Sequence, residues 1–215
     1  ALFHVAWARV LAQCCGQDDV VFGTVLTGRM IGYAGVERTI GMFINTLPIR
    51  IKVGGISVEQ AVVEAHKNLI ALLAHEQTSL TLALRCSAVD KAMPLFTTIL
   101  NYRHIKNSEL SPDEEDLEGL RTIIGGEERS NYPITFSVDD FGDLFGFTVQ
   151  CVNGISPVKF IGWTCSFIEK LVAALISVSN KQLKTISILP EKEYQQLIFD
   201  WNPRCTEYPE NCIIH

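Results

Sequence analysis

The stretch IGMFINTLPIRI, residues 40–51, places polar side chains inside an apolar strand pattern. Asn45 and Thr46 interrupt the pattern midway, and Arg50 stands near its end. Amide and hydroxyl groups both donate and accept hydrogen bonds, and leaving such a group buried without a partner costs about 1–3 kcal/mol. Two hypotheses follow from this cost. These side chains satisfy backbone groups where the strand begins, or they face a ligand.

The usual patterns of catalytic chemistry are missing from this sequence. There is no GxSxG turn, no HExxH pair, and no GxGxxG or GxxxxGK[ST] loop. His4 lies in an apolar helical stretch and is predicted to be a packing residue. The acidic run DEED, residues 113–116, is predicted to be a solvated loop, because hard-metal ligands must converge from folded elements. We therefore predict no catalytic residue and no metal site in this chain.

Charge and composition narrow the class of protein. The 215 residues are 47% hydrophobic and 20% charged, which is typical of a globular domain. A net charge of −6 without any basic run argues against nucleic acid and against a membrane surface as partners. The 7 cysteines have no CxxC spacing and fit neither a disulfide framework nor a zinc site, so we expect a reducing, cytoplasmic location.

Hydrophobic periodicity predicts the elements that must position the polar side chains. Helices are expected over residues 2–15, 57–76, 80–87 and 163–181, with shorter ones near 35–42 and 190–199. Strands are expected over residues 18–29, 44–53, 94–104, 132–142 and 144–152, the last two as a hairpin. Residues 106–118 read as a flexible acidic loop. This order predicts an α/β sandwich with a mixed sheet. The helix already in progress at Ala1 suggests a piece of a larger protein.

Five segments, in order, resemble the C-terminal half of condensation domains of nonribosomal peptide synthetases. They are VVFGTVLTGR with GVERTIGMFINTLPIRI, NLIALLAHEQTSL, LRCSAVDKAMPLFTTILNYRH, NYPITFSVDDFGDLFGFTVQC and ILPEKEYQQLIFDWNPRCTEYP. The resemblance implies a chloramphenicol-acetyltransferase-like sandwich lobe over residues 1–186, with helices packed on a mixed sheet. Residues 187–215 would then begin the linker toward an adenylation domain.

The resemblance also implies a function. Two lobes of this family enclose a tunnel in which an aminoacyl amine attacks an upstream peptidyl thioester, and this lobe would form the acceptor-side wall. The family's catalytic HHxxxDG motif belongs to the other lobe and is absent here, so the chain alone is expected to be inactive. No cofactor is expected to bind directly, because the substrates travel on the 4'-phosphopantetheine of carrier proteins. The implied partners are the N-terminal lobe, the upstream and downstream carrier proteins and the adenylation domain.

Individual positions take their implied roles from the same resemblance. The substrate tunnel would be lined by Asn45, Thr46, Asn101 and Ser137. Arg50 and Arg85 would have structural or charge-anchoring roles. The loop that crosses beneath the tunnel would contain Gly28 and Arg29. Residues 119–152 match the latch that crosses above it.

Two alternatives stay open at this level. Epimerization domains share the fold, and the glycine-rich RMIGYAG is superficially similar to their motifs. The segment GMFINTLPIRI, in contrast, resembles the corresponding segment of condensation domains. A lobe that lacks the catalytic histidines could also be a noncatalytic docking surface for a carrier protein.

Overall fold

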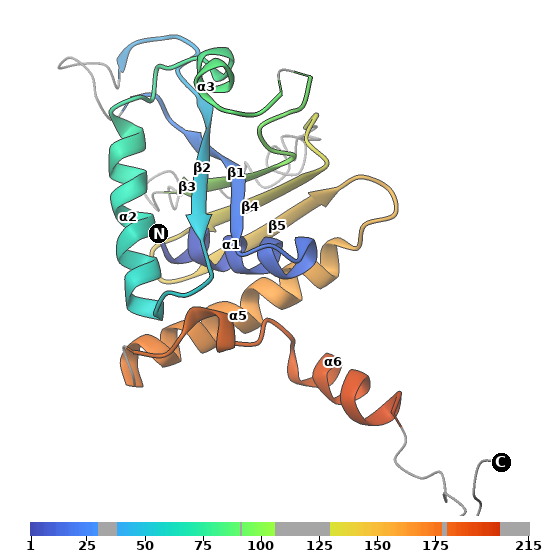
Figure 1. Cartoon of the computed structure of the whole chain (residues 1–215). Coiled ribbons are helices and arrows are strands. Elements are labelled where there is room, and N and C mark those ends of the chain that lie inside the picture. The colour runs from blue at the N-terminus through green and yellow to red at the C-terminus, as the bar shows by residue number, and fades with distance from the viewer. Residues whose placement is uncertain (30–37, 91, 106–129, 178–179, 203–215) are drawn as a thin grey trace, which may run out of the picture.

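The computed structural model describes residues 1–29, 38–90, 92–105, 130–177 and 180–202. In these residues a sheet runs in the order β2-β1-β3-β4-β5 (Figure 1). Its strands are β1 (Asp19–Leu26), β2 (Asn45–Lys52), β3 (Thr98–His104), β4 (Ile134–Asp140) and β5 (Phe145–Cys151). The pairs β1·β3 and β3·β4 are parallel, and β1·β2 and β4·β5 are antiparallel. The predicted mixed α/β sheet and its hairpin are confirmed.

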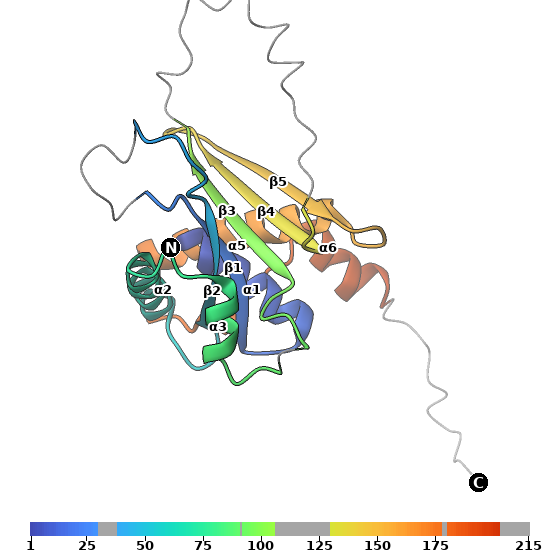
Figure 2. The ribbon, with the colours of Figure 1, turned by 90° about the horizontal axis from the view of Figure 1, so that it is seen from above.

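Helices cover one face of this sheet. Helix α1 (Leu2–Cys15) and helix α5 (Pro157–Ser177) pack together there, and α2 (Val58–Leu73) lies beside them next to β2 (Figures 1 and 2). The indole ring of Trp7 is fully buried and stacks on Phe136 with ring centroids 4.9 Å apart. Its Nε1 donates a hydrogen bond of 3.0 Å to Thr98 Oγ1. The hydrophobic core therefore lies between the sheet and these helices.

The helix ends carry the expected local signals. Helix α1 ends at Gly16, whose φ of 65° is left-handed backbone that a glycine adopts without strain. Helix α2 begins with a capping box: Ser57 Oγ accepts from the Gln60 backbone N–H, and Gln60 Oε1 accepts from the Ser57 backbone N–H. The predicted helix stop and the predicted N-cap are confirmed.

Two predicted helices differ from the structure. Helix α5 begins at Pro157, ahead of the predicted residue 163, because proline suits a first helical turn and the interior Gly162 is tolerated. A Cβ added at Gly162 would lie 3.7 Å from Pro190, so the glycine sits where the following segment packs closely. Residues 35–37 of the helix predicted over 35–42 lie outside the described residues. Residues 39–42 are not helical and lead into β2, so this part of the prediction is wrong.

The segment after the core stays close to α5. It contains the 3₁₀ turn η4 (Leu183–Thr185), helix α6 (Glu191–Gln195) and the π-helical turn η5 (Gln196–Asp200). Lys170 Nζ donates to Leu189 O at 2.7 Å, and Trp163 Nε1 donates to Glu193 Oε2 at 2.7 Å. The predicted helix near 190–199 is confirmed, while the boundary after residue 186 stays a prediction. The predicted acidic loop, residues 106–118, lies outside the described residues.

Helix α5 is long and apolar enough to cross a membrane by length and composition, and no other described helix meets that test. Its inward residues, Phe160, Phe167 and Leu171, are buried in the core. A core helix passes the same test, so this feature carries little weight for a membrane span.

Candidate functional site: a groove on the open face of the sheet

The two faces of the sheet differ in chemistry. On β4, Phe136 and Val138 are fully buried in the core beneath α1 and α5. Thr135 and Ser137 alternate with Phe136 and Val138 along the strand, so their side chains point to the opposite side of the sheet. We call that opposite side the open face.

Two polar rows cross the open face in register. The first row aligns Ile99, Thr135 and Gln150 on β3, β4 and β5, and the second aligns Asn101, Ser137 and Thr148. In a sheet, residues aligned in this way have neighbouring side chains on one face. Uncharged hydrogen-bonding groups thus occupy the middle of the open face.

A groove of about 660 Å³ lies on this face. Its walls include the apolar Val25, Ile44 and Ile99 and the polar Thr46, Asn101, Thr135 and Gln150. The structure brings the predicted residues Thr46 and Asn101 into this one groove although they lie on different strands. Ser137 is buried beside Asn101 in the second row. That the groove is part of a substrate tunnel stays a prediction.

Asn45 uses its carboxamide within the lobe. Its Nδ2 donates to Glu76 O and to Thr78 O, both at 2.8 Å, and its Oδ1 accepts from the Thr46 backbone N–H at 2.9 Å. These bonds attach the first residue of β2 to the turn that follows α2. The geometry supports the strand-end hypothesis for Asn45, and its assignment to a tunnel wall stays a prediction without support from these contacts.

The two predicted anchoring arginines lie away from the groove. Arg50 Nε and Nη2 donate to the Asp19 carboxylate at 2.9 and 2.6 Å, and this hydrogen bonding lowers the pKa of Asp19. The pair joins β2 to β1 but is solvent-exposed, so it contributes little to stability. Arg85 lies exposed in the last turn of α3 (Leu80–Cys86).

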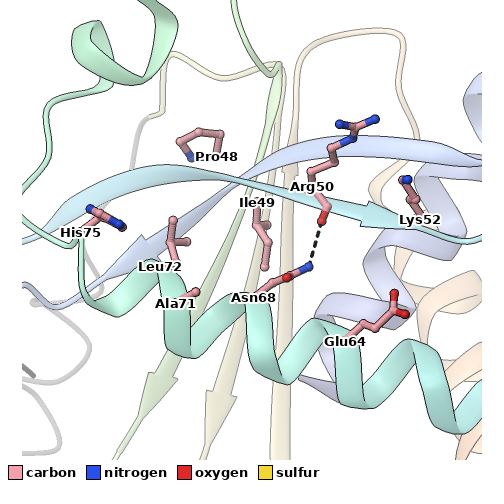
Figure 3. A pocket seen from close by; sticks show the side chains of 9 residues that line it. All are labelled: Pro48, Ile49, Arg50, Lys52, Glu64, Asn68, Ala71, Leu72 and His75. Atoms are coloured by element: carbon pink, nitrogen blue, oxygen red, sulfur yellow. Dashed lines mark hydrogen bonds between the residues drawn. The ribbon is translucent and has the colours of Figure 1, made fainter. Parts of the chain in front are cut away.

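Arg50 also borders a second groove, of about 520 Å³, between β2 and α2 (Figure 3). There Asn68 Nδ2 donates to Arg50 O at 3.4 Å, which satisfies a carbonyl on the outer edge of the sheet (Figure 3). This groove holds none of the residues predicted to line the tunnel. It is a weaker candidate site than the groove on the open face.

The described start of the predicted crossing loop is packed against the chain just before β2. Gly28 has a φ of 68°, and a Cβ there would lie 1.8 Å from Phe43 O, so no other residue fits without a backbone shift. Its carbonyl accepts from Gln77 Nε2 at 2.9 Å. The Arg29 guanidinium lies 4.6 Å from the centroid of the Phe43 ring. Residues 30–37 lie outside the described residues.

A charged cluster marks the ends of β3 and β4. Arg103 forms a two-bond pair with Asp139, with Nε donating to Oδ1 at 2.6 Å and Nη2 to Oδ2 at 3.0 Å. The Tyr102 hydroxyl donates to Asp140, and His104 Nδ1 lies 3.2 Å from the same carboxylate. Burial, with the bond to Asp140, raises the pKa of Tyr102 to about 12. Among the described residues, no group of three or more His, Cys, Asp or Glu could hold a metal ion.

His4 is a core residue, as predicted. Its Nε2 lies 2.9 Å from Thr24 Oγ1, and burial lowers the pKa of the imidazole to about 3. The ring is therefore neutral near pH 7.

Thr135 and Gln150 line the groove but are not among the residues that the sequence predicts there. The alternation in ITFSVDD, residues 134–140, carried the signal, because Thr135 shares a face with Ser137. Nothing in the local pattern indicated Gln150, which reaches the groove only through its pairing with Thr135.

Curated relatives match this chain over all or most of its length. Malpibaldin synthetase of Mortierella alpina is 40% identical over 215 residues, which are 100% of this chain and 4% of that protein. Bacitracin synthase 3 of Bacillus licheniformis is 26% identical over 212 residues, or 96% of this chain and 3% of that protein. Nonribosomal peptide synthetase 8 of Aspergillus fumigatus is 30% identical over 187 residues, or 86% of this chain and 2% of that protein. The chain thus spans a small fraction of these relatives.

Solved structures and a family model agree with these relatives. The starter condensation domain of rhizomide synthetase matches with a TM-score of 0.63 at 16% identity, over 87% of this chain and 42% of that one. A four-domain nonribosomal peptide synthetase matches with a TM-score of 0.63 at 11% identity, over 90% of this chain and 16% of that one. At these identities the structures show the fold. The family model for the condensation domain covers residues 1–198. The chain belongs to the condensation-domain family.

Proposed function

We propose that this chain is the C-terminal, acceptor-side lobe of a nonribosomal peptide synthetase condensation domain and forms one wall of its substrate tunnel. The observation that carries the proposal is the open face, where a groove away from α1 and α5 is lined by hydrogen-bonding side chains such as Thr46, Asn101 and Gln150, with the ion-paired Arg103 also in its wall. The chain's match to 42% of the rhizomide starter condensation domain is the coverage expected for one of two lobes.

The proposed reaction is amide formation between two tethered substrates. The amine of a downstream aminoacyl group attacks the carbonyl carbon of an upstream thioester. A C–N bond forms, the C–S bond breaks, and the amine's proton passes to the departing thiolate. Holding both reactants in a productive geometry can contribute roughly 7–11 kcal/mol. In this scheme Thr46, Asn101 and Ser137 bind the extended substrate chain, and the catalytic HHxxxDG motif comes from the other lobe.

The proposed partners follow from this role. They are the N-terminal lobe, an upstream and a downstream peptidyl carrier protein, and an adenylation domain. Substrates arrive on the 4'-phosphopantetheine of the carriers, and no cofactor binds the lobe directly. We place the protein in the cytoplasm, where an adenylation domain has access to ATP and free amino acids.

A reconstitution experiment tests the proposal. A complete synthetase module that carries this chain is supplied with one carrier loaded with an acyl group and one loaded with an amino acid. Mass spectrometry of the carriers should find the amide product. The 215-residue chain alone should give none above a carrier-only control, because it has no HHxxxDG motif.

The other outcomes identify the alternatives. Inversion of the upstream residue without coupling would indicate an epimerization-type domain. Carrier binding by a complete module that forms no product would indicate a noncatalytic docking lobe. Product from the chain alone would contradict the assignment of catalysis to the missing lobe.

A further inference from the structure

Thr135 has a buried hydroxyl with no hydrogen-bond partner in the part of the chain that the structure describes. The residue is 6% exposed and lines the groove on the open face, and its Oγ1 makes no hydrogen bond to any described group. Burying a hydroxyl in this way is unfavourable, since the group loses its bonds to water and gains none in exchange. Packing alone would be served better by valine, which has nearly the same shape.

Other threonines buried as deeply have partners. Thr24 Oγ1 lies 2.9 Å from His4 Nε2, and Thr98 Oγ1 accepts from Trp7 Nε1 at 3.0 Å. Thr164 Oγ1 donates to Phe160 O at 2.7 Å. The unsatisfied hydroxyl of Thr135 is therefore no general property of buried threonines in this fold, and it occurs at the wall of a groove.

The surroundings of Thr135 favour an uncharged ligand group. Its aligned neighbours are Ile99 and Gln150, of which one is apolar and the other carries a carboxamide. Arg103 on β3 also lines the groove, but its charge is paired with Asp139 on β4. Asp139 lies four positions along the strand from Thr135, roughly 13 Å. A hydroxyl beside a carboxamide in such a setting matches a secondary amide, which offers one donor and one acceptor.

We infer that Thr135 is a substrate-binding residue, whose hydroxyl hydrogen-bonds an amide of the tethered substrate chain lying in this groove, with Gln150 beside it. The inference rests on the proposed function and adds to it the residue and the chemical group that are recognised. The amide is one of the two in the pantetheine arm, because the aminoacyl part of the acceptor has an amine and no amide.

The test compares Thr135→Val with Thr135→Ser in the complete module. Valine keeps the shape and removes the hydroxyl, so kcat/KM for condensation should fall roughly three- to tenfold, the value of one hydrogen bond. Serine keeps the hydroxyl and should stay near the wild-type value. The melting temperature of Thr135→Val should be unchanged or higher, because an unsatisfied buried group has been removed.

Thr98→Val is the matched control. It removes a buried hydroxyl that has a partner and leaves Trp7 Nε1 without an acceptor, so it should lower the melting temperature. Its condensation rate per folded molecule should stay normal. A structural role for Thr135 would make its valine variant behave like this control.

The results separate this inference from the proposed function. An inactive wild-type module would contradict the proposed function. An active wild-type module with equal kcat/KM for Thr135→Val, or with a loss in proportion to unfolding, would overturn the role of Thr135. A loss seen with carrier-tethered acceptors but not with an aminoacyl N-acetylcysteamine thioester places the contact at the pantetheine amide farther from the thioester. A loss with both acceptors places it at the amide next to the thioester, which N-acetylcysteamine keeps.

Discussion

Asn45 shows why a polar residue in an apolar pattern need not face a ligand. Its carboxamide reaches two backbone carbonyls after α2 and the first peptide N–H of β2. Those carbonyls lie in the turn between α2 and α3, outside both helices. One side chain thus joins this turn to the start of the sheet's edge strand.

Replacing Asn45 with alanine should therefore destabilise the lobe. The variant should lose about 1–3 kcal/mol of unfolding free energy, because the backbone carbonyls of Glu76 and Thr78 lose their hydrogen-bond donor. In a domain of this size each kcal/mol lowers the melting temperature by roughly 2–4 °C. Thermal denaturation of wild type and variant measures this effect.

Asn68→Ala is the control for that experiment. Asn68 is exposed and makes a longer bond, 3.4 Å to Arg50 O, so its loss should change stability by less than about 0.5 kcal/mol. If Asn45→Ala instead slowed condensation in the complete module without a melting shift, the tunnel hypothesis for Asn45 would be restored.

The docking of helix α1 on the sheet depends on two hydrogen bonds inside an apolar interface. His4 meets Thr24 on β1, and Trp7 meets Thr98 on β3. The two pairs fix the helix lengthwise over the parallel β1·β3 pair, since both side chains must reach particular strand positions.

This docking should weaken in acid. Burial lowers the pKa of His4 to about 3, whereas an unfolded histidine titrates near 6.5. Between these values the unfolded chain binds a proton that the folded chain does not, so unfolding free energy falls as pH drops from about 6.5 toward 3. At pH 5 the loss from this one group is about 2 kcal/mol.

Urea unfolding of wild type and His4→Gln at pH 7 and pH 5 measures the contribution. The glutamine variant is expected to lose less stability between the two pH values, because it has no imidazole to protonate. Carboxylates contribute equally to both proteins and cancel in the comparison. An identical pH dependence would contradict the buried, neutral state of His4.

The two sides of the molecule as a whole are unlike. Helices α1, α2 and α5 bury one face of the sheet, whereas the other face carries the groove and the β4–β5 hairpin tip is exposed. At the tip Phe141, Leu144 and Phe145 are exposed, Leu144 to 73%. Clustered exposed apolar side chains are typical of an interaction surface. The tip lies within residues 119–152, which we predict to cross to the other lobe.

The isolated chain should therefore associate with itself. Light scattering over a concentration series should show mass above that of one chain, and a hydrophobic dye should bind. Substituting Leu144 with lysine should reduce both signals, while lysine at the exposed Val63 on α2 should not. A strictly monomeric chain that binds no dye would count against the crossing assignment.

The elements and the family could be predicted from the order of the amino acids alone. Regular apolar spacing indicated most helices and strands, because burial of one face imposes a period of 3.6 or 2 residues on the chain. Local signals such as Gly16 and Ser57 marked the helix ends, since capping involves only neighbouring residues. The order of five motifs pointed to the family that the relatives share.

Which polar residues share a site depends instead on the packing of distant segments. Asn45 and Thr46 are adjacent in sequence, yet one bonds to the turn after α2 and the other lines the groove, because successive residues of a strand face opposite ways. Thr135 and Gln150 meet only through the register of β4 and β5. The hairpin turn after Asp140 fixes that register locally, but whether the row faces a groove or the helices is decided by how the whole sheet packs, which no local pattern encodes.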